Sequence, residues 1–262
     1  MRIILTVILF LLVSVMPARS QDYSLFEKRS FISSRGDTLP YRILYPENYD
    51  RSIKYPVVLF LHGAGERGND NEKQLVHGGK LFLADSNRKK FPAIVIFPQC
   101  PENNYWARAK INRNVTPYEI GFDYTGPVSG PLNAALELTR QLLSEESADK
   151  RRVYITGLSM GGMGTFEAVY RAPKLFAAAS PICGGGDPKA YNKKTAKVPF
   201  RIFHGAADAV VNVQLSRDMV NRLKELKARR FSYTEYPGVN HNSWDNAFAE
   251  PDFLAWLFLQ KR

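Results

Sequence analysis

Residues 153–161 read VYITGLSMG, and this stretch decides the fold. Its first four residues are apolar or β-branched, which is typical of a buried strand, and the residues after Gly161 favour a helix. A Gly-x-Ser-x-Gly turn between a strand and a helix strains the serine backbone, and its glycines stand where side chains would collide. Such a turn raises the hydroxyl of Ser159 above the sheet, at a helix N-terminus that favours negative charge. We therefore interpret Ser159 as a nucleophile.

Strands and helices alternate along the chain on both sides of this turn. Near-continuous apolar runs predict strands at residues 55–61, 93–97, 153–156 and 200–203. Helical periodicity predicts helices near residues 72–85, 131–146, 161–171, 213–228 and 250–260. A turn-rich stretch predicts an antiparallel hairpin made of residues 25–33 and 38–46. The pattern indicates an α/β fold with a mostly parallel sheet covered on both faces, whose ligands bind at the carboxyl ends of the strands.

A serine hydroxyl is a weak nucleophile at neutral pH and needs a base, and the sequence offers four histidines as candidates. His62 and His204 each end an apolar strand, and we interpret both as structural. His77 lies in a helical segment and is expected at the surface or behind the site. His241 lies in a loop between an expected strand and the last helix. We therefore predict that His241 is the base.

The orienting acid should lie between Ser159 and His241, because the chain order with this type of turn is serine, acid, histidine. Asp208 follows the strand 200–203 at the sheet edge where Ser159 is expected. It would accept the imidazole N–H, fix the tautomer and stabilise the imidazolium. Asp187 follows a run of three glycines and Asp245 comes after the histidine, so both are less well placed. We predict Asp208.

Acyl transfer at a serine also requires donors for the developing oxyanion. The backbone N–H of Met160, directly after the nucleophile, is the first candidate. The second is the N–H of Ala64, in the glycine-rich stretch 62–65 that follows the strand 55–61, and this assignment is good to one residue. Gly65 is a candidate for contact with the substrate.

Residues 98–130 break the alternation of strands and helices with a long, aromatic-rich stretch that leaves the carboxyl end of a strand. Long irregular loops in compact domains are usually functional. We expect this loop to wall the substrate cleft, with Trp106 as the best contact and Trp244, next to the base loop, as another. The alternative is that the aromatic residues only pack the loop onto the body.

Residues 1–20 are predicted to be a secretory signal peptide. Arg2 precedes an apolar run, and small residues stand at positions 18 and 20, as cleavage requires. The run is short for a bilayer core of about 30 Å, so an uncleaved anchor is the less favoured alternative. We expect a secreted or periplasmic protein without a stable membrane anchor, with residues 21–262 forming a single domain.

The net charge is +11. Lysines and arginines are scattered in short runs at residues 88–90, 150–152, 193–194 and 229–230, without the aromatic interleaving of nucleic-acid sites. We interpret them as a solvated surface with no nucleic-acid partner, and a preference for acidic substrates stays open.

Cys100 and Cys183 each follow an expected strand, and those strands are not expected to be neighbours, so a disulfide between them is the less favoured alternative.

With these motifs in hand, the sequence resembles the esterase branch of the α/β-hydrolase superfamily. This branch includes feruloyl and acetyl-xylan esterases, polyhydroxybutyrate-depolymerase-like enzymes and relatives of the prolyl oligopeptidase catalytic domain. The matching stretches are HGAGERG at 62–68, PQCP at 98–101 with Trp106, GLSMGG at 157–162, HGAAD at 204–208 and GVNHNSW at 238–244.

The resemblance implies a triad of Ser159, Asp208 and His241, no cofactor or metal, and ester hydrolysis through an acyl-enzyme. We therefore expect an exported carboxylesterase acting on a small-molecule or polysaccharide ester, with feruloyl or acetyl groups on plant polysaccharide as the first hypothesis. The alternatives are lysophospholipase-like or lipase-like activity, a small serine peptidase, and a non-catalytic binding module on the same fold. The peptidase is disfavoured because the sequence has no propeller like that of the oligopeptidases.

Overall fold

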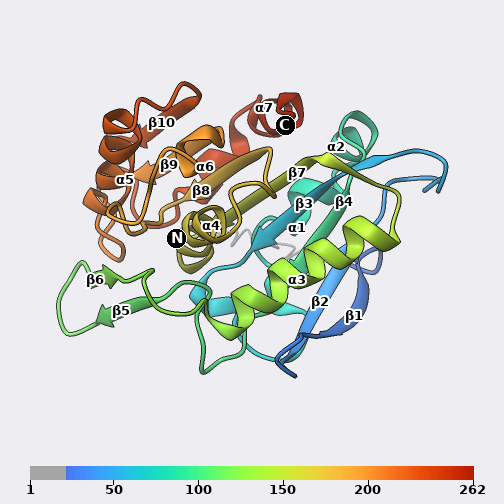
Figure 1. Ribbon diagram of the computed structural model, residues 1–262, viewed down its shortest axis with the longest axis horizontal. Coiled ribbons are helices and arrows are strands. Elements are labelled where there is room, and N and C mark those ends of the chain that lie inside the picture. The colour runs from blue at the N-terminus through green and yellow to red at the C-terminus, as the bar shows by residue number, and fades with distance from the viewer. Residues whose placement is uncertain (1–21) are drawn as a thin grey trace, which may run out of the picture.

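The computed structural model describes residues 22–262, so the expected signal peptide lies outside the described residues. A central sheet has the strand order β1-β2-β4-β3-β7-β8-β9-β10 (Figure 1). β1 and β2 form an antiparallel hairpin, β2 is antiparallel to β4, and the strands from β4 to β10 in this order are parallel. The strands are β1 (Glu27–Ile32), β2 (Thr38–Leu44), β3 (Tyr55–Leu61), β4 (Ile94–Pro98), β7 (Ala148–Leu158), β8 (Ala178–Ile182), β9 (Phe200–Gly205) and β10 (Phe231–Tyr236).

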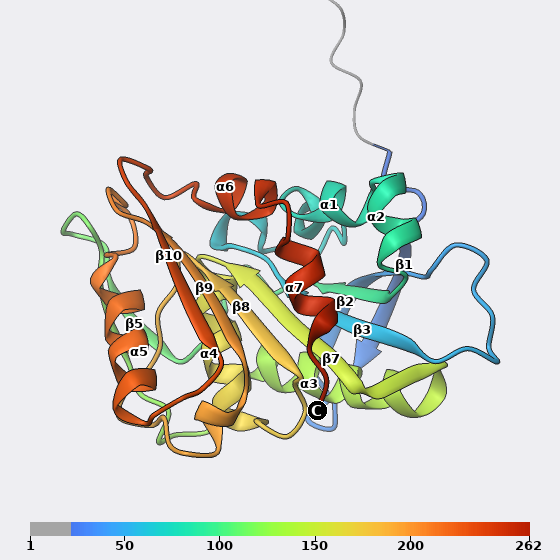
Figure 2. The same ribbon diagram turned by 90° about the horizontal axis from the view of Figure 1, so that it is seen from above.

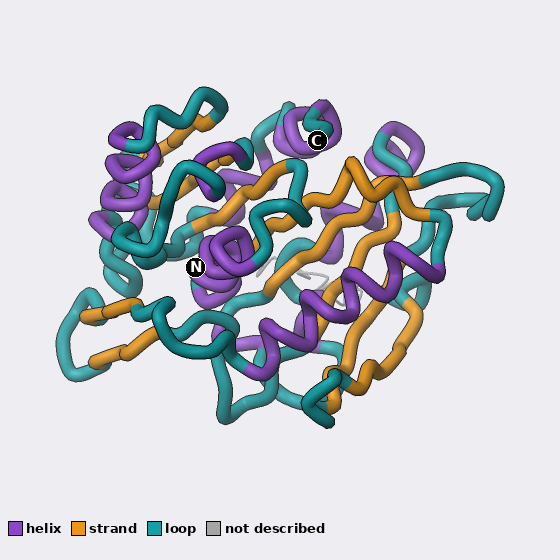
Figure 3. Tube along the Cα trace, in the orientation of Figure 1, coloured by secondary structure: helices purple, strands orange, loops and turns teal. Residues whose placement is uncertain are grey.

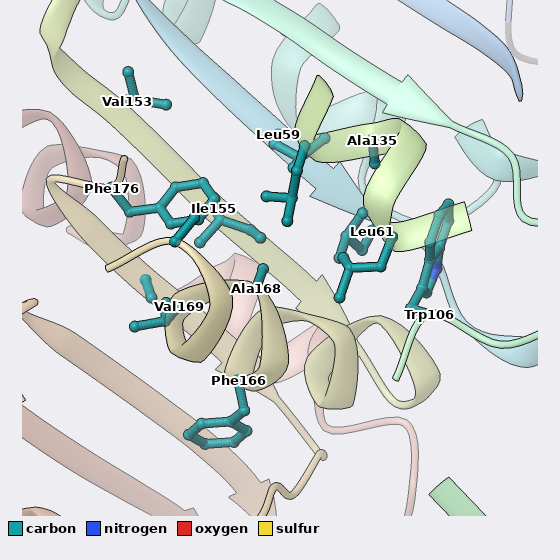
Figure 4. Packing of buried hydrophobic residues seen from close by; sticks show 14 of the residues in the cluster. Leu59, Leu61, Trp106, Ala135, Val153, Ile155, Phe166, Ala168, Val169 and Phe176 are labelled. Carbon is teal, nitrogen blue, oxygen red and sulfur yellow. The ribbon is translucent and has the colours of Figure 1, made fainter. Parts of the chain in front are cut away.

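Helices cover both faces of the sheet, as the buried side chains of β3 show. Leu59 points into a cluster with α3 (Gly130–Glu145), α4 (Met160–Arg171) and α5 (Gln214–Glu225). Phe60 points the other way, into a cluster with α1 (Gly79–Leu83), α6 (Trp244–Ala249) and α7 (Phe253–Leu259). Figure 4 shows part of the first cluster. Strands buried on both faces explain the unbroken apolar runs, and the predicted α/β architecture is confirmed.

The helix expected over residues 72–85 is broken into pieces. A short 3-10 turn (Lys73–Leu75) is followed by α1, and α2 (Asp85–Lys90) is separate. The break falls at Gly78, which has a φ of 90° and lies against the ring of Phe60. A Cβ atom at this position would lie 2.4 Å from that ring, so the backbone turns where only glycine fits. Helical periodicity in the sequence did not reveal this turn.

The stretch 98–130, expected to be irregular, contains a hairpin of β5 (Ala109–Asn112) and β6 (Glu119–Phe122) outside the main sheet (Figure 3). The backbone N–H of Tyr118 donates to the carbonyl of Val210 at 2.9 Å, which ties the hairpin to the loop after β9. Among residues 22–262, none of the helices has both the length and the apolar character that crossing a bilayer requires.

Candidate active site

Ser159 lies on the sharp turn between β7 and α4. Its φ of 54° and ψ of −117° place a non-glycine residue in a strained region of backbone space. A Cβ atom on Gly157 would lie 2.6 Å from the carbonyl oxygen of Gly161, and one on Gly161 would lie 1.9 Å from that of Leu61. The backbone N–H of Ser159 donates to Ile182 O at 2.9 Å. The strand–turn–helix conformation that the motif predicted is present, and its glycines are sterically required.

The structure brings Ser159, His241 and Asp208 together at the carboxyl edge of the sheet. Asp208 follows β9 and His241 follows β10. His241 Nε2 lies 2.9 Å from Ser159 Oγ, and His241 Nδ1 lies 2.8 Å from Asp208 Oδ2. Because a carboxylate only accepts, Nδ1 carries the proton and Nε2 is left free to accept the serine proton. The arrangement has the geometry of an activated nucleophile.

The carboxylate of Asp208 is buried and accepts hydrogen bonds on both oxygens. Oδ1 accepts the backbone N–H groups of Val210 and Val211, each at 2.8 Å. Oδ2 faces both His241 and His204. Burial alone would raise the pKa of Asp208, but the hydrogen bonds from His204 and His241 outweigh it and hold the pKa well below the usual range. The group is therefore a fixed negative charge behind the imidazole.

His204, interpreted from the sequence as structural, contacts the candidate acid directly. Its Nε2 lies 3.2 Å from Asp208 Oδ2 and 2.9 Å from Val211 O, and since both are acceptors this nitrogen carries a proton. Its Nδ1 lies 2.7 Å from Ser216 Oγ. The ring is fully buried. The signal for this contact was present in the sequence, since His204 lies near the end of β9 and only four positions before Asp208.

Each of the two candidate oxyanion donors begins a helical segment beside the cleft over Ser159. Met160 is the first residue of α4 and Ala64 the first of the 3-10 turn Ala64–Glu66, so neither N–H has an acceptor within its helix. Arg67 braces the loop, since its Nε donates to Ala64 O at 2.9 Å.

His62, at the start of this loop, is fully buried. Its Nδ1 donates to Gly63 O at 2.6 Å, and its Nε2 accepts the N–H of Cys100 at 2.9 Å. Burial lowers the pKa of His62 to about 4. The ring is therefore a neutral connection between the loop after β3 and the loop after β4, in keeping with the structural role interpreted from the sequence.

A cleft of about 270 Å³ opens over Ser159. Gly65 and Trp244, two of the candidate contact residues, line it. The ring of Trp244 lies between His241, at a centroid distance of 5.4 Å, and His77, at 5.0 Å. His77 thus lines the cleft, with its Nε2 3.7 Å from a carboxylate oxygen of Glu66. Sequence reasoning missed both His77 and Glu66 as cleft residues.

Trp106 is not a cleft residue, and its predicted contact with substrate is wrong. Its side chain is 0% exposed and packs beside Leu61 and Ala135 in the core (Figure 4). Its indole N–H donates to His62 O at 3.1 Å, so it supports the loop that carries Ala64. The neighbouring Tyr105 lines the cleft instead. The aromatic loop does wall the cleft, but through Tyr105 and the β5–β6 hairpin.

Cys100 and Cys183 are both buried and unpaired, and two strands separate the strands that precede them. Cys183, Asp208 and His241 lie close enough to share a metal ion. However, burial raises the pKa of the Cys183 thiol, and its sulfur accepts the N–H of Ser159 at 3.2 Å. The ligand atoms of Asp208 and His241 are already hydrogen-bonded to each other. This donor set fits the hydrogen-bonded arrangement better than a metal site.

Comparison with known proteins gives the family. A family model described as phospholipase/carboxylesterase matches residues 50–254. The chain therefore belongs to this family of serine hydrolases with the α/β-hydrolase fold, and the resemblance seen in the sequence is confirmed.

Several of the relatives are named as esterases. Carboxylesterase SOBER1 of Arabidopsis thaliana is 23% identical over 71% of this chain and 82% of its own length. A bifunctional acetylxylan esterase/xylanase of Neocallimastix patriciarum is 38% identical over 80 residues, which are 30% of this chain and 12% of that protein. A crystal structure of a thermostable esterase superposes with a TM-score of 0.80 at 37% identity, covering 91% of this chain and 64% of that one. The ferulic acid esterase of Anaeromyces mucronatus, solved with ferulic acid, shares the fold, with a TM-score of 0.65 at 17% identity over 92% of this chain and 94% of that one.

Proposed function

We propose that this chain is an exported serine carboxylesterase that cleaves feruloyl or acetyl esters on plant polysaccharide. The observation that carries the proposal is the hydrogen-bonded chain from Ser159 Oγ through His241 to Asp208. The family match supports the ester bond as the target. The relatives named as acetylxylan and ferulic acid esterases support the choice of acyl group.

In the proposed acylation step, His241 Nε2 takes the proton of Ser159 Oγ as this oxygen attacks the ester carbonyl carbon. The N–H groups of Ala64 and Met160 stabilise the oxyanion, and each such donor contributes roughly 2.7–4 kcal/mol. When the tetrahedral intermediate collapses, the carbon–oxygen bond to the alcohol breaks. His241 then protonates the departing oxygen, and the acyl group stays on Ser159.

Deacylation repeats these steps with water as the nucleophile. His241 takes a proton from the water as its oxygen attacks the acyl carbon. Collapse of the second intermediate breaks the bond to Ser159 Oγ, which receives the proton back from His241. Throughout, Asp208 keeps its charge and stabilises the imidazolium, which agrees with the hydrogen bonds that lower its pKa.

The size and lining of the cleft favour a small acyl group. A volume of about 270 Å³ lies below the roughly 300–1,000 Å³ of pockets for drug-sized ligands. Apolar side chains from the β5–β6 hairpin, α4 and the loop after β9 form one wall, namely Ile111, Ile120, Met163, Val210 and Val211. This wall suits an acetyl group or an aromatic acyl group better than the long chain of a phospholipid.

Export is the part of the proposal that rests on residues 1–20, and the mature protein should begin at Gln21. A relative named as an uncharacterized secreted protein of Arthroderma benhamiae, 25% identical over 79% of this chain and 23% of its own length, is consistent with this location. N-terminal sequencing of protein recovered from the medium or the periplasm tests it. An intact Met1 on the recovered protein contradicts signal cleavage.

A substrate panel tests the activity, with the Ser159→Ala variant as the blank. The panel contains p-nitrophenyl acetate, methyl ferulate, acetylated xylan, a lysophospholipid and a peptide. We expect hydrolysis of the first three and labelling by a fluorophosphonate probe, both lost in Ser159→Ala. A preference for the lysophospholipid or the peptide overturns the substrate class, and absence of labelling favours a binding module.

A further inference from the structure

A second groove lies at the opposite edge of the sheet, where the parallel strands begin. Its volume is about 860 Å³. Half of the residues that line it are lysine or arginine, and none is aspartate or glutamate. Six of these cations are Arg140, Arg171, Lys174, Lys194, Lys197 and Arg230. We call these residues and the space between them the basic groove.

The basic groove collects cations from segments that lie far apart in the sequence. Arg140 belongs to α3 and Arg171 ends α4. Lys174 precedes β8, Lys197 precedes β9, and Arg230 precedes β10. Since parallel strands begin at one edge of the sheet, the residues before them come together there (Figure 2). Two of the runs that looked scattered in the sequence, 193–194 and 229–230, therefore meet on one surface.

Most of these charges are not neutralised within the protein. Arg171 is paired with the buried Glu167 at 2.9 Å. Within residues 22–262, no carboxylate lies within ion-pairing distance of Arg140, Lys174, Lys194, Lys197 or Arg230. Like charges held together without partners attract counter-ions, and a polyanion that replaces those ions gains from their release.

The floor of the basic groove shows what kind of polyanion fits. Pro173, Leu175 and Pro199 give it an apolar surface between the cations. The pyranose ring of a uronic acid offers an apolar C–H face for such a floor and a carboxylate for the lysines. The only aromatic residue lining the groove, Phe176, is buried, so no exposed ring is available to stack on nucleic-acid bases.

We propose that the basic groove binds an acidic polysaccharide through the carboxylates of its uronic acid units. The choice of a polysaccharide rests on the proposed function, whereas the affinity for carboxylates rests on the groove alone. Because the groove and the cleft lie at opposite edges of the sheet, a chain bound in the groove leaves the cleft open. The groove thus holds the enzyme on its polymer while Ser159 acts on another strand of the same material.

Binding of de-esterified polygalacturonate, measured by affinity electrophoresis and calorimetry, tests the proposal. The test variant combines Lys174→Glu, Lys194→Glu and Lys197→Glu. The matched control combines Lys80→Glu, Lys89→Glu and Lys90→Glu, three exposed lysines on α1 and α2 that change the net charge equally. We expect the groove variant to bind roughly tenfold or more weakly and the control to bind as the wild type does. Hydrolysis of p-nitrophenyl acetate should stay unchanged in both.

Three outcomes overturn the proposal. Equal weakening in the two variants means that net charge alone draws the polymer. Absence of binding by the wild type means that the groove has no affinity for uronate chains. Tighter binding of polyphosphate, duplex DNA or anionic lipid vesicles at the same salt assigns the groove to another polyanion. Failure of the proposed esterase is a separate result, because it appears in the substrate panel and leaves polymer binding intact.

Discussion

The two edges of the sheet use charge in opposite ways. At the carboxyl edge, Asp208 is buried and its carboxylate accepts hydrogen bonds from His241, His204 and two backbone N–H groups. At the amino edge, Lys174, Lys194 and Lys197 are exposed and have no ion-pair partner among the described residues. The hydrogen bonds around Asp208 hold its carboxylate in one position, whereas the exposed lysines create a positive electrostatic field that attracts any anion.

The number of charges at a site therefore matters less than whether hydrogen-bond or ion-pair partners within the protein satisfy them. A buried carboxylate with a full set of donors cannot move, which is what an orienting acid requires. Exposed lysines are flexible and screened by salt, which suits a repeating polymer but not a catalytic step. Changes at the carboxyl edge should therefore affect rate constants, and changes at the amino edge should affect binding and its salt dependence.

The largest expected effect comes from breaking the buried network at the carboxyl edge. Asp208→Asn keeps the shape of the side chain but offers His241 a mixed donor and acceptor, which favours the wrong tautomer. We expect kcat for p-nitrophenyl acetate to fall by about 10⁴-fold. Asp187→Asn, at the rival carboxylate, is the matched control and should keep wild-type kcat. An equal fall in kcat in the two variants would contradict the assignment of Asp208 as the orienting acid.

A second prediction separates packing from substrate contact within the aromatic loop. Trp106→Ala removes a fully buried side chain, and we expect it to lower the free energy of unfolding by about 3–5 kcal/mol. Tyr105→Ala removes a partly exposed cleft residue and should raise KM for methyl ferulate while changing stability by less than about 1 kcal/mol. Urea denaturation of both variants measures the change in stability, and steady-state kinetics measure the change in KM. A normal stability for Trp106→Ala would contradict the packing assigned to it.

Tyr105 and Trp106 also show which features can be predicted from the sequence and which cannot. The sheet and its flanking helices follow from apolar periodicity, and the turn at Ser159 follows from its glycines, because those patterns report burial and steric demand directly. The candidate partners Asp208 and His241 follow from their order after Ser159 and from their places beyond expected strands. The direction of a side chain in an irregular loop depends on tertiary contacts. Trp106 turns inward because Gly164 leaves space for it and His62 O accepts its N–H. Nothing in the local sequence distinguishes it from Tyr105.

The basic groove is a second feature that the local sequence could not predict, because it depends on which segments the fold brings together. Lys194 and Arg230 are thirty-six positions apart in the numbering, and each lies in a short run that reads as ordinary surface. They share a groove only because β9 and β10 are parallel neighbours, so that their preceding loops meet. The sequence predicted a parallel sheet but not its strand order, and the strand order decides which charges become neighbours.

A third prediction concerns the acid stability of the carboxyl edge. The pKa of His62 is lowered to about 4 in the folded chain, so between pH 6.5 and 4 the unfolded chain binds a proton that the folded chain does not. The neutral ring of His62 contributes its full stabilisation above pH 6.5. As the pH drops towards 4, the free energy of unfolding falls by up to about 3 kcal/mol. Urea denaturation at several pH values measures how steeply the free energy of unfolding changes with pH. His62→Asn should flatten this part of the curve, and an unchanged slope contradicts the assignment.

The smallest expected effect tests whether His204 does more than pack. His204→Leu fills similar space but removes the donor to Asp208 Oδ2, a hydrogen bond to a charged group worth about 1.5–3 kcal/mol. Part of this stabilisation supports the imidazolium that forms on His241 during the reaction. We therefore expect kcat to fall roughly tenfold with little change in KM. His204→Gln restores an N–H donor and should recover part of the rate.

Rescue by His204→Gln separates a positioning role from a structural one. If His204 only fills space, leucine should serve as well as histidine, and kcat per folded molecule should stay at the wild-type value in both variants. Ser216→Ala gives a further control, because it removes the partner of His204 Nδ1 while the bond to Asp208 remains. A loss of rate in Ser216→Ala as large as that in His204→Leu would mean that ring orientation, and not the donated proton, is what Asp208 needs from this histidine.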